Sequence, residues 1–240
     1  MNRALLFAPL LLACSAAALT VAKMDLPADF ASAATEIRVS GFGGKNKGSF
    51  AFDGYNGEFK RGETRLGIFD PLFVSSKGKS SFSFREAGNT EPVSADCAMK
   101  KGSVTIGIVT FDPKKMSYEC DFRQGKQLLG ARFILGQPKA SGFKQAVLAQ
   151  DLRAGEAIIF NQHLTMQSVH RFKGTPLQSP SPVGYLVQTD GRTIAAVELT
   201  DTNPTFYLSP DLDVALRRSA LIASLALSVL RDPANSALED

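Results

Sequence analysis

The side chains most often used in catalysis are few in this chain and show no catalytic spacing. Its two histidines, His163 and His170, stand seven residues apart, so on one strand they would point to opposite faces of a sheet. No Gly-x-Ser-x-Gly motif supports a hydrolase nucleophile. Acidic residues are numerous, but no pair among them stands out. An enzyme is therefore not indicated, and the alternative left open is a site assembled from carboxylates or histidines distant in the sequence.

The glycine-rich run from Gly41 to Gly48 has some likeness to a phosphate-binding loop. It lacks the required spacing, because Asn46 rather than Ser or Thr follows Lys45 and no glycine stands five residues before Gly44. We interpret the run as a loop between strands. No cluster of cysteine and histidine has the spacing of a metal site, and we predict no cofactor.

The cysteines suggest one disulfide. There are three, and if Cys14 is set aside for the reason given below, Cys97 and Cys120 remain as an even number. In an oxidising compartment such a pair favours a disulfide, which would close a loop of about two dozen residues and contribute about 3 kcal/mol. Two buried free thiols are the alternative.

The first residues have the layout of a secretory signal peptide. Arg3 supplies a positive charge, residues 4–13 are uncharged and apolar, and small residues follow. The apolar run of ten residues is half of the roughly 20 needed to span a bilayer, so we expect no permanent transmembrane helix here.

The exit of this segment reads Leu11-Leu12-Ala13-Cys14 and resembles the bacterial lipobox, whose cysteine receives diacylglycerol before cleavage. The resemblance implies a signal peptide at 1–13 and lipid attachment at Cys14. Ser15 after the cysteine implies sorting to the outer membrane, on its periplasmic side. The alternative is ordinary cleavage further along, for instance after Ala18 or Ala22, which would leave a soluble periplasmic protein.

Length and charge indicate one domain with a mixed surface. The 240 residues can bury one substantial core, and 27 basic against 23 acidic residues give a formal charge of +4. Basic and acidic residues are intermixed, as in Lys60-Arg61-Gly62-Glu63, so no stripe for nucleic acid forms. We expect a lipidated tether at 14–34, a folded domain at 35–232 and a short tail at 233–240.

From Thr35 onward about a dozen short β-type runs alternate with turn signals. The clearest hairpin joins residues 185–189 and 192–197 through Asp190-Gly191, and it predicts that Val187 faces Ile194 and Tyr185 faces Ala196. Runs 103–110 and 116–122 predict a second hairpin, and the three prolines of residues 173–182 predict a surface loop.

Residues 211–231 predict a helix. Ser209 is the expected N-cap, Pro210 the first helical residue, Asp213 and Arg217 an i, i+4 ion pair, and Pro233 the stop. Twelve uncharged residues between Arg218 and Arg231 give about 18 Å of helix, too short for a hydrocarbon core of about 30 Å.

The apolar side chains of this helix cover most of its circumference. They spread over roughly 240° around the axis, whereas a surface helix shows a stripe a little over about 100° wide. A sheet of strands curled around the helix would bury such a surface and would remove the sheet's own edges. We therefore predict an antiparallel β-barrel of about twelve strands enclosing the helix; the alternatives are a helix over an open, curved sheet or a helix facing a partner.

At this point the chain resembles a known superfamily, the tubby-like barrel, which includes LURP-one-related proteins and phospholipid scramblases. The resemblance rests on GYLVQTDGRTIAAVEL, then FYL at 206–208, then DLDVALRRSALIASLALSVL, about the last quarter of the chain. It implies a twelve-stranded barrel around a central helix and, in some members, contact with lipid. No lipid-binding motif of the superfamily can be placed on these residues.

Together these features predict a lipid-anchored bacterial envelope protein that serves as a non-catalytic binding or assembly module. Its expected partners are the membrane through the N-terminal lipid and an envelope protein or a lipid. Because the helix would fill the barrel, a ligand would have to use the outer wall or loops such as Lys173 to Pro182.

Overall fold

The computed structural model of the chain describes residues 21–62, 79–86, 91–101, 105–106, 109–110, 116–138 and 152–230. The predicted signal peptide, Cys14, the end of the predicted helix at Arg231 and the tail at 233–240 lie outside these residues.

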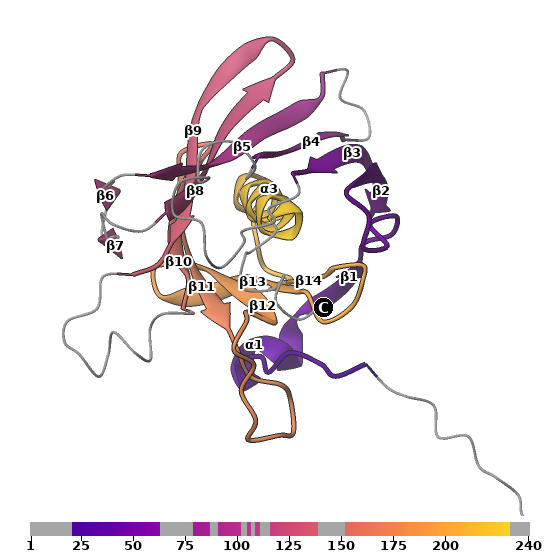
Figure 1. Ribbon diagram of the computed structural model, residues 1–240, viewed down its shortest axis with the longest axis vertical. Helices are drawn as coiled ribbons and strands as arrows, with labels where there is room; N and C mark the ends of the chain where they lie inside the picture. The colour runs from indigo at the N-terminus through magenta and orange to yellow at the C-terminus, as the bar shows by residue number, and fades with distance from the viewer. Residues whose placement is uncertain are drawn as a thin grey trace, which may run out of the picture.

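Twelve antiparallel strands form one sheet that curls around a central helix (Figure 1). Their order in the sheet is β1-β14-β13-β12-β11-β10-β9-β8-β5-β4-β3-β2. The strands are β1 (Thr35–Arg38), β2 (Lys47–Phe52), β3 (Tyr55–Arg61), β4 (Lys79–Arg85), β5 (Val93–Lys101), β8 (Met116–Gln124), β9 (Gln127–Gly136), β10 (Ala154–Ile159), β11 (Gln162–Val169), β12 (Gly184–Thr189), β13 (Arg192–Glu198) and β14 (Thr205–Leu208). Two short strands, β6 (Thr105–Ile106) and β7 (Val109–Thr110), pair with each other outside the barrel, and β7 lies beside β10.

The sheet nearly closes on itself. Its two end strands, β1 and β2, follow one another in the chain, and just past β1 the backbone of Ser40 pairs with that of Ala51 in β2. Ser40 N–H donates to Ala51 O at 2.9 Å, and Ala51 N–H donates to Ser40 O at 3.1 Å. The prediction of an antiparallel barrel of about twelve strands around a C-terminal helix is confirmed.

Buried and more exposed side chains alternate along the strands, because one face of each strand is buried against the helix. In β4 the side chains of Ser80, Phe82 and Phe84 point inward and those between them point outward, as the SSFSF pattern predicts. Phenylalanines of β2, β3 and β4 form a stacked group on one side of the interior. Aromatic side chains therefore fill the part of the interior next to β2, β3 and β4.

Helix α3 runs from Val214 to Val229, and all residues from Ser219 to Val229 are buried. Two polar residues of the helix, Ser224 and Ser228, are also inside. Each donates its hydroxyl to the carbonyl four residues earlier, at 2.8 Å, so their burial leaves no hydroxyl without a partner. No helix in the described part of the chain is long and apolar enough to cross a membrane.

The start of α3 differs from the prediction. The N-cap is Asp213, whose carboxylate accepts from Leu216 N–H at 2.8 Å, and not Ser209. Ser209 donates instead to Asp211, and Arg192 in β13 bonds Asp211 at 2.8 Å. These contacts hold residues 209–211 in a turn against β13, so the helix begins later.

The predicted ion pair between Asp213 and Arg217 is also wrong, because both side chains have other partners. Arg217 reaches Asp53 in the β2–β3 turn, with Nη2 to Oδ2 at 2.7 Å. The next residue, Arg218, bonds Glu86 at 2.6 Å and lies 4.2 Å from the ring centre of Phe160. The N-terminal part of α3 thus contacts three connections between strands: β2–β3, β4–β5 and β10–β11.

Arginine and tyrosine side chains bond the carbonyls at the other end of α3. Arg61 donates from Nη2 to Ser228 O at 2.7 Å. Its guanidinium carbon lies 4.7 Å from the ring centre of Phe42 and 5.2 Å from that of Phe59. The last carbonyls of a helix have no partner within it, so Arg61 supplies one inside the barrel.

The β12–β13 hairpin turns at Asp190-Gly191 as predicted, with φ of 50° and 76°. Its register is shifted by one residue beyond the turn: Val187 faces Ala195 and Tyr185 faces Val197. A β-bulge between Val187 and Gln188 causes the shift, because it places an extra residue on one strand. The predicted pairs with Ile194 and Ala196 were therefore wrong.

The hairpin predicted between 103–110 and 116–122 is not the pairing in the structure. Strand β8 pairs with β5 on one side and with β9 on the other. The described residues of 103–110 pair among themselves as β6 and β7.

The N-terminal segment packs on the barrel from Met24 onward, within the range predicted as a tether. Met24 is buried and pairs with Phe172, and helix α1 (Ala28–Ala33) buries Phe30 on the outer face of β12, β13 and β14. Gly184 allows this close approach, since a Cβ there would lie 2.2 Å from Met24 Sδ. The segment that could act as a free tether is therefore shorter than residues 14–34.

Candidate binding surface

Because α3 occupies the inside of the barrel, we expect hollows that could bind a ligand on its outer surface. Two of them adjoin on the outer wall of β2, β3, β4 and β5, with volumes of ≈ 590 Å³ and ≈ 300 Å³. Glu58 and Ser83 line both. We call this surface the β2–β5 wall; its outward side chains are Lys47, Ser49, Ala51, Asn56, Glu58, Lys60, Ser81, Ser83, Arg85, Ser94 and Asp96.

The wall is hollow because small side chains alternate with the inward phenylalanines. Ser49, Glu58, Ser83 and Ser94 face one another in one row across the four strands. Three of these four are serines, which leave space between larger neighbours. Gly57 of β3 is at an inward position, where a Cβ would lie 2.4 Å from the Phe50 ring, so the core leaves no room for a side chain there.

A second row across the same strands brings like charges together. Lys47 of β2 lies opposite Lys60 of β3, and further along the row Asp96 of β5 lies opposite Asp121 of β8. Like charges in directly opposite positions destabilise a sheet. Two lysines and two aspartates separated by Ser81 thus give the wall a positive and a negative end.

The charged side chains of the wall have no partner among the described residues. Glu58, Lys60, Arg85 and Asp96 are exposed and make no hydrogen bond or ion pair within that part of the structure. Their donors and acceptors are available to a ligand. The arrangement suits recognition of a polar partner with complementary charges.

The two histidines do not share a strand, because β11 includes His163 and ends at Val169, one residue before His170. His163 on β11 is half-exposed, with Nε2 at 3.4 Å from Glu156 Oε2 of β10, and Glu156 is completely buried on the outward side of its strand. This pair brings a histidine and a buried carboxylate together, and sequence reasoning missed it because it depends on the β10–β11 pairing.

His170 has a structural position at the base of the loop between β11 and β12. Its Nδ1 lies 3.0 Å from Ser179 O, and its Nε2 lies 3.0 Å from Ser168 Oγ. Arg171 pairs with Gln178 across the same loop. The proline-rich segment 173–182 is thus a surface loop, and hydrogen bonds near its two ends hold it to the barrel.

The glycine-rich run is a loop, and several of its N–H groups are already bonded. Gly43 N–H donates to Asn203 Oδ1 at 2.9 Å, and Gly44 N–H donates to Thr202 O at 3.2 Å. Phe42 is buried. The run closes one end of the barrel between β1 and β2.

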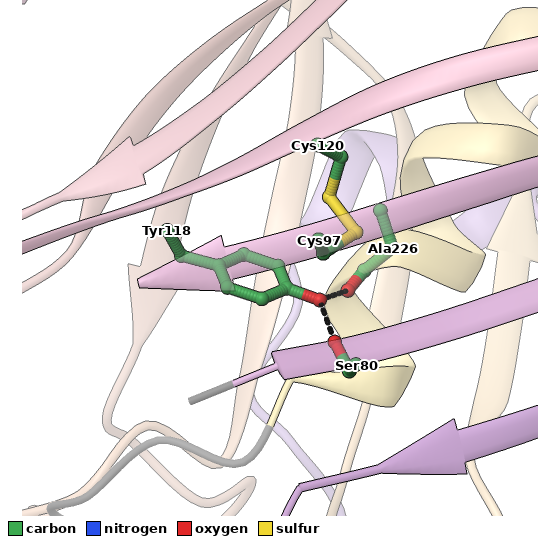
Figure 2. The surroundings of a disulfide bond; sticks show 5 residues. All are labelled: Ser80, Cys97, Tyr118, Cys120 and Ala226. Atoms are coloured by element: carbon green, nitrogen blue, oxygen red, sulfur yellow. Dashed lines mark hydrogen bonds between the residues drawn. A yellow bond between two sulfur atoms is a disulfide. The ribbon is translucent and has the colours of Figure 1, made fainter. Parts of the chain in front are cut away.

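Cys97 and Cys120 are joined by a disulfide across β5 and β8, as Figure 2 shows. Beside it, Ser80 Oγ and Tyr118 OH are 2.5 Å apart, and Tyr118 donates to Ala226 O of α3 at 3.5 Å. Burial raises the pKa of the Tyr118 hydroxyl far above its usual value. The strands β4, β5 and β8 are therefore tied both to each other and to the helix.

Removing this disulfide should lower the free energy of unfolding by about 3 kcal/mol, by the loop-entropy estimate for a separation of 23 residues. The double variant Cys97→Ala, Cys120→Ala, compared with the parent by urea unfolding, measures it. Dithiothreitol should lower the stability of the parent and leave the double variant unchanged. Equal stability of parent and variant would contradict the expectation.

Alkaline pH should destabilise the barrel through Tyr118. Its pKa is raised in the folded state, so its contribution is fully present below the pKa of the unfolded chain, about 10, and is lost as pH rises above it. Unfolding free energies measured at about pH 9 and about pH 11 should fall more steeply for the parent than for Tyr118→Phe. Identical slopes would remove Tyr118 as the cause.

No group of three or more histidine, cysteine, aspartate or glutamate side chains among the described residues could hold a metal ion. Comparison of the chain with protein-family models, with curated proteins and with solved structures found no match.

Proposed function

We propose that the protein is a lipid-anchored bacterial envelope protein whose barrel is a non-catalytic binding or assembly module. In this proposal Cys14 carries the lipid on the periplasmic side of the outer membrane. The β2–β5 wall binds a partner protein.

The observation that carries the proposal is a barrel filled by its own helix, with an outer wall whose charges have no partner among the described residues. Ser219 to Val229 occupy the interior, so a lipocalin-like ligand chamber is absent from the part of the barrel that the structure describes. The unpaired charges and the opposed Lys47 and Lys60 are understandable if a partner supplies the compensating groups.

We also propose a distant relation to the tubby-like barrel superfamily. The support is architectural: a twelve-stranded antiparallel barrel, a hairpin at Asp190-Gly191 and a closing hydrophobic helix at the C-terminal end. A shared architecture alone assigns no ligand, and we transfer none.

The anchor is tested by replacing the proposed lipid site. The parent chain, expressed in a bacterial host, should incorporate radiolabelled palmitate and sediment with membranes. Cys14→Ala should incorporate none and should appear in the soluble periplasmic fraction. Palmitate incorporation by Cys14→Ala, or its absence from the parent, would refute the anchor.

The wall is tested by photo-crosslinking in the envelope. A photoreactive residue at Ser83 should capture one dominant protein, while the same residue at Gln167, exposed on β11 across the barrel, should not. The variant Lys60→Glu should abolish capture from position 83. Equal capture from both positions, capture that ignores the charge reversal, or capture of lipid alone would overturn the protein-binding wall.

Stability supplies the control for this experiment. The single variant Lys60→Glu replaces a like-charge pair with an opposite-charge pair opposite Lys47. The isolated protein should then be as stable as the parent or more stable, by up to about 1 kcal/mol. Loss of capture in a protein that is no less stable separates binding from folding.

A second candidate function, a periplasmic enzyme, is favoured by one observation, the contact between His163 and the buried Glu156. A half-exposed histidine held by a buried carboxylate could accept a proton from a bound substrate. In a screen against envelope ester, amide and glycoside substrates, turnover lost in both His163→Ala and Glu156→Gln but kept in His170→Ala would support the enzyme.

A further inference from the structure

The N-terminal segment joins the barrel at the loop between β11 and β12. Lys173 N–H donates to Lys23 O at 2.8 Å, and Asp25 N–H donates to Arg171 O at 2.9 Å. Figure 1 shows this loop, in orange, beside α1. From Lys23 onward, therefore, the chain is fixed to the barrel and cannot lengthen a tether.

This attachment limits the distance between a lipid on Cys14 and the barrel. Lys23 is the ninth residue after Cys14, and a fully extended chain covers at most about 3.6 Å per residue. Lys23 can therefore lie no more than about 32 Å from the lipidated residue. A domain of this size is roughly 40 Å across, so the wall that carries Lys23 cannot face directly away from the membrane.

The surface around the attachment has the composition of a membrane-contacting surface. Leu177 at the far end of the proline-rich loop is 71% exposed, and Val21 is 51% exposed. Exposed basic side chains surround them. We call this the anchor-side surface and define it by Val21, Lys23, Arg171, Lys173 and Leu177.

The basic side chains are only partly offset by acids. Arg171 lies 3.6 Å from Asp25, and Lys23 lies 3.8 Å from the buried Glu198. Lys173 is exposed and has no acidic partner within the described ranges. Glu36 also interacts with Lys23, so the positive charge without an acidic partner is that of Lys173, four residues before the exposed Leu177.

The loop holds Leu177 in place. His170 bonds the carbonyl of Ser179, and Arg171 pairs with Gln178 on the opposite side of the loop. Leu177 N–H donates to Thr175 Oγ1 at 3.1 Å. An apolar side chain presented on a fastened loop loses little entropy when it enters a bilayer.

We propose that the anchor-side surface docks on an anionic bilayer, with Leu177 inserted among the acyl chains near the headgroups and Lys173 against the phosphates. This inference rests on the proposed lipid anchor and names the second partner of the same module. The diacylglycerol on Cys14 would hold the chain at the membrane, and a basic, apolar contact beside it would fix the orientation of the barrel.

Docking in this orientation would turn the β2–β5 wall away from the membrane. The N-terminal segment packs on β12, β13 and β14. In the ring of twelve strands, six lie between β13 and β4 on one side and four on the other. The two surfaces lie on opposite sides of the barrel. The partner wall would thus face the periplasm.

The experiment places a polarity-sensitive fluorophore on Leu177→Cys in the full, lipidated chain. Cys97 and Cys120 are joined to each other and Cys14 is acylated, so the label has one free thiol. The protein is reconstituted on vesicles of phosphatidylethanolamine and phosphatidylglycerol that contain brominated phospholipid. The matched control is Leu128→Cys, a leucine that is 61% exposed on β9 close to the β8–β9 turn.

We expect the brominated lipid to quench the label at position 177 several-fold more than the label at position 128. A second pair of proteins carries the label at Lys173→Cys, one with Leu177 and one with Leu177→Glu. The label should be quenched several-fold less in the protein with Leu177→Glu. If the protein is acylated and remains on the vesicles but both positions are quenched equally or not at all, docking is wrong and the anchor stands. If the chain takes no palmitate and does not remain on the vesicles, both proposals fail.

Discussion

Leu225→Asp should leave the protein without a cooperative unfolding transition. Leu225 is completely buried in α3, with strands around the helix. A carboxylate there would be removed from water among apolar side chains, at a cost of several kcal/mol on top of the lost leucine burial. Native domains are stable by only about 5–15 kcal/mol, so the variant should have little native population.

The milder Leu225→Ala should fold but lose about 3–5 kcal/mol, since truncation leaves a cavity that the surrounding strands cannot close completely. Urea unfolding followed by circular dichroism measures both variants. The matched control is Val214→Asp in the first turn of the same helix, where the side chain is 84% exposed. It should change stability by less than about 0.5 kcal/mol, because acid is tolerated at the positive end of a helix. A folded Leu225→Asp protein with parent-like stability would contradict the filled barrel.

Arg61→Ala should cost about 2–4 kcal/mol, from a charge-assisted hydrogen bond and from stacking on aromatic rings. Its guanidinium bonds Ser228 O at 2.7 Å and lies over Phe42 and Phe59, so its removal leaves a buried helix carbonyl without that donor. Arg61→Lys should recover only part of the loss, because an ammonium cannot stack as a planar guanidinium does.

Lys60→Ala is the control for this prediction. Lys60 is the neighbouring residue, points outward and has no partner in the described part of the structure, so its removal should change stability by less than about 0.5 kcal/mol. Chemical unfolding of the three variants and the parent gives the comparison. Equal losses for Arg61→Ala and Lys60→Ala would show that the end of the helix is not held as described.

The architecture was predictable because it depends on sequence patterns that are each contained in one short segment, such as an apolar helix or a turn. The uncharged run of α3 was too short for a bilayer and too apolar for a surface, which left burial by the strands. Asp190-Gly191 marked its turn because both residues need positive φ, and both have it. The bulge after Val187 was not predictable, since no residue there demands one.

Local signals misplaced the start of the helix because two caps competed. Ser209-Pro210 satisfied the general rule for an N-terminus, and Asp213 satisfied it again a turn later. The contact of Arg192 with Asp211 decided between them, and that contact joins different elements of the fold. Sequence spacing alone contains no such information.

The candidate site could not be predicted for the same reason. Lys47 and Lys60 become a like-charge pair only in the register of β2 and β3, and Asp96 meets Asp121 only because β5 pairs with β8. That second pairing joins strands separated in the chain by β6 and β7. The outward serines of β4 were visible in the sequence, but the hollow that they help to line depends on four strands together.

The most direct measurement of the central claim is the reactivity of a thiol placed on α3. Ala223→Cys puts it at a position that is completely buried, and Val214→Cys puts it at one that is 84% exposed on the same helix. In native buffer the thiol at position 214 should react with a maleimide as fast as a free peptide thiol. The thiol at position 223 should react only at the rate of global unfolding, and fully in urea. Equal native rates at the two positions would mean that the strands do not enclose the helix.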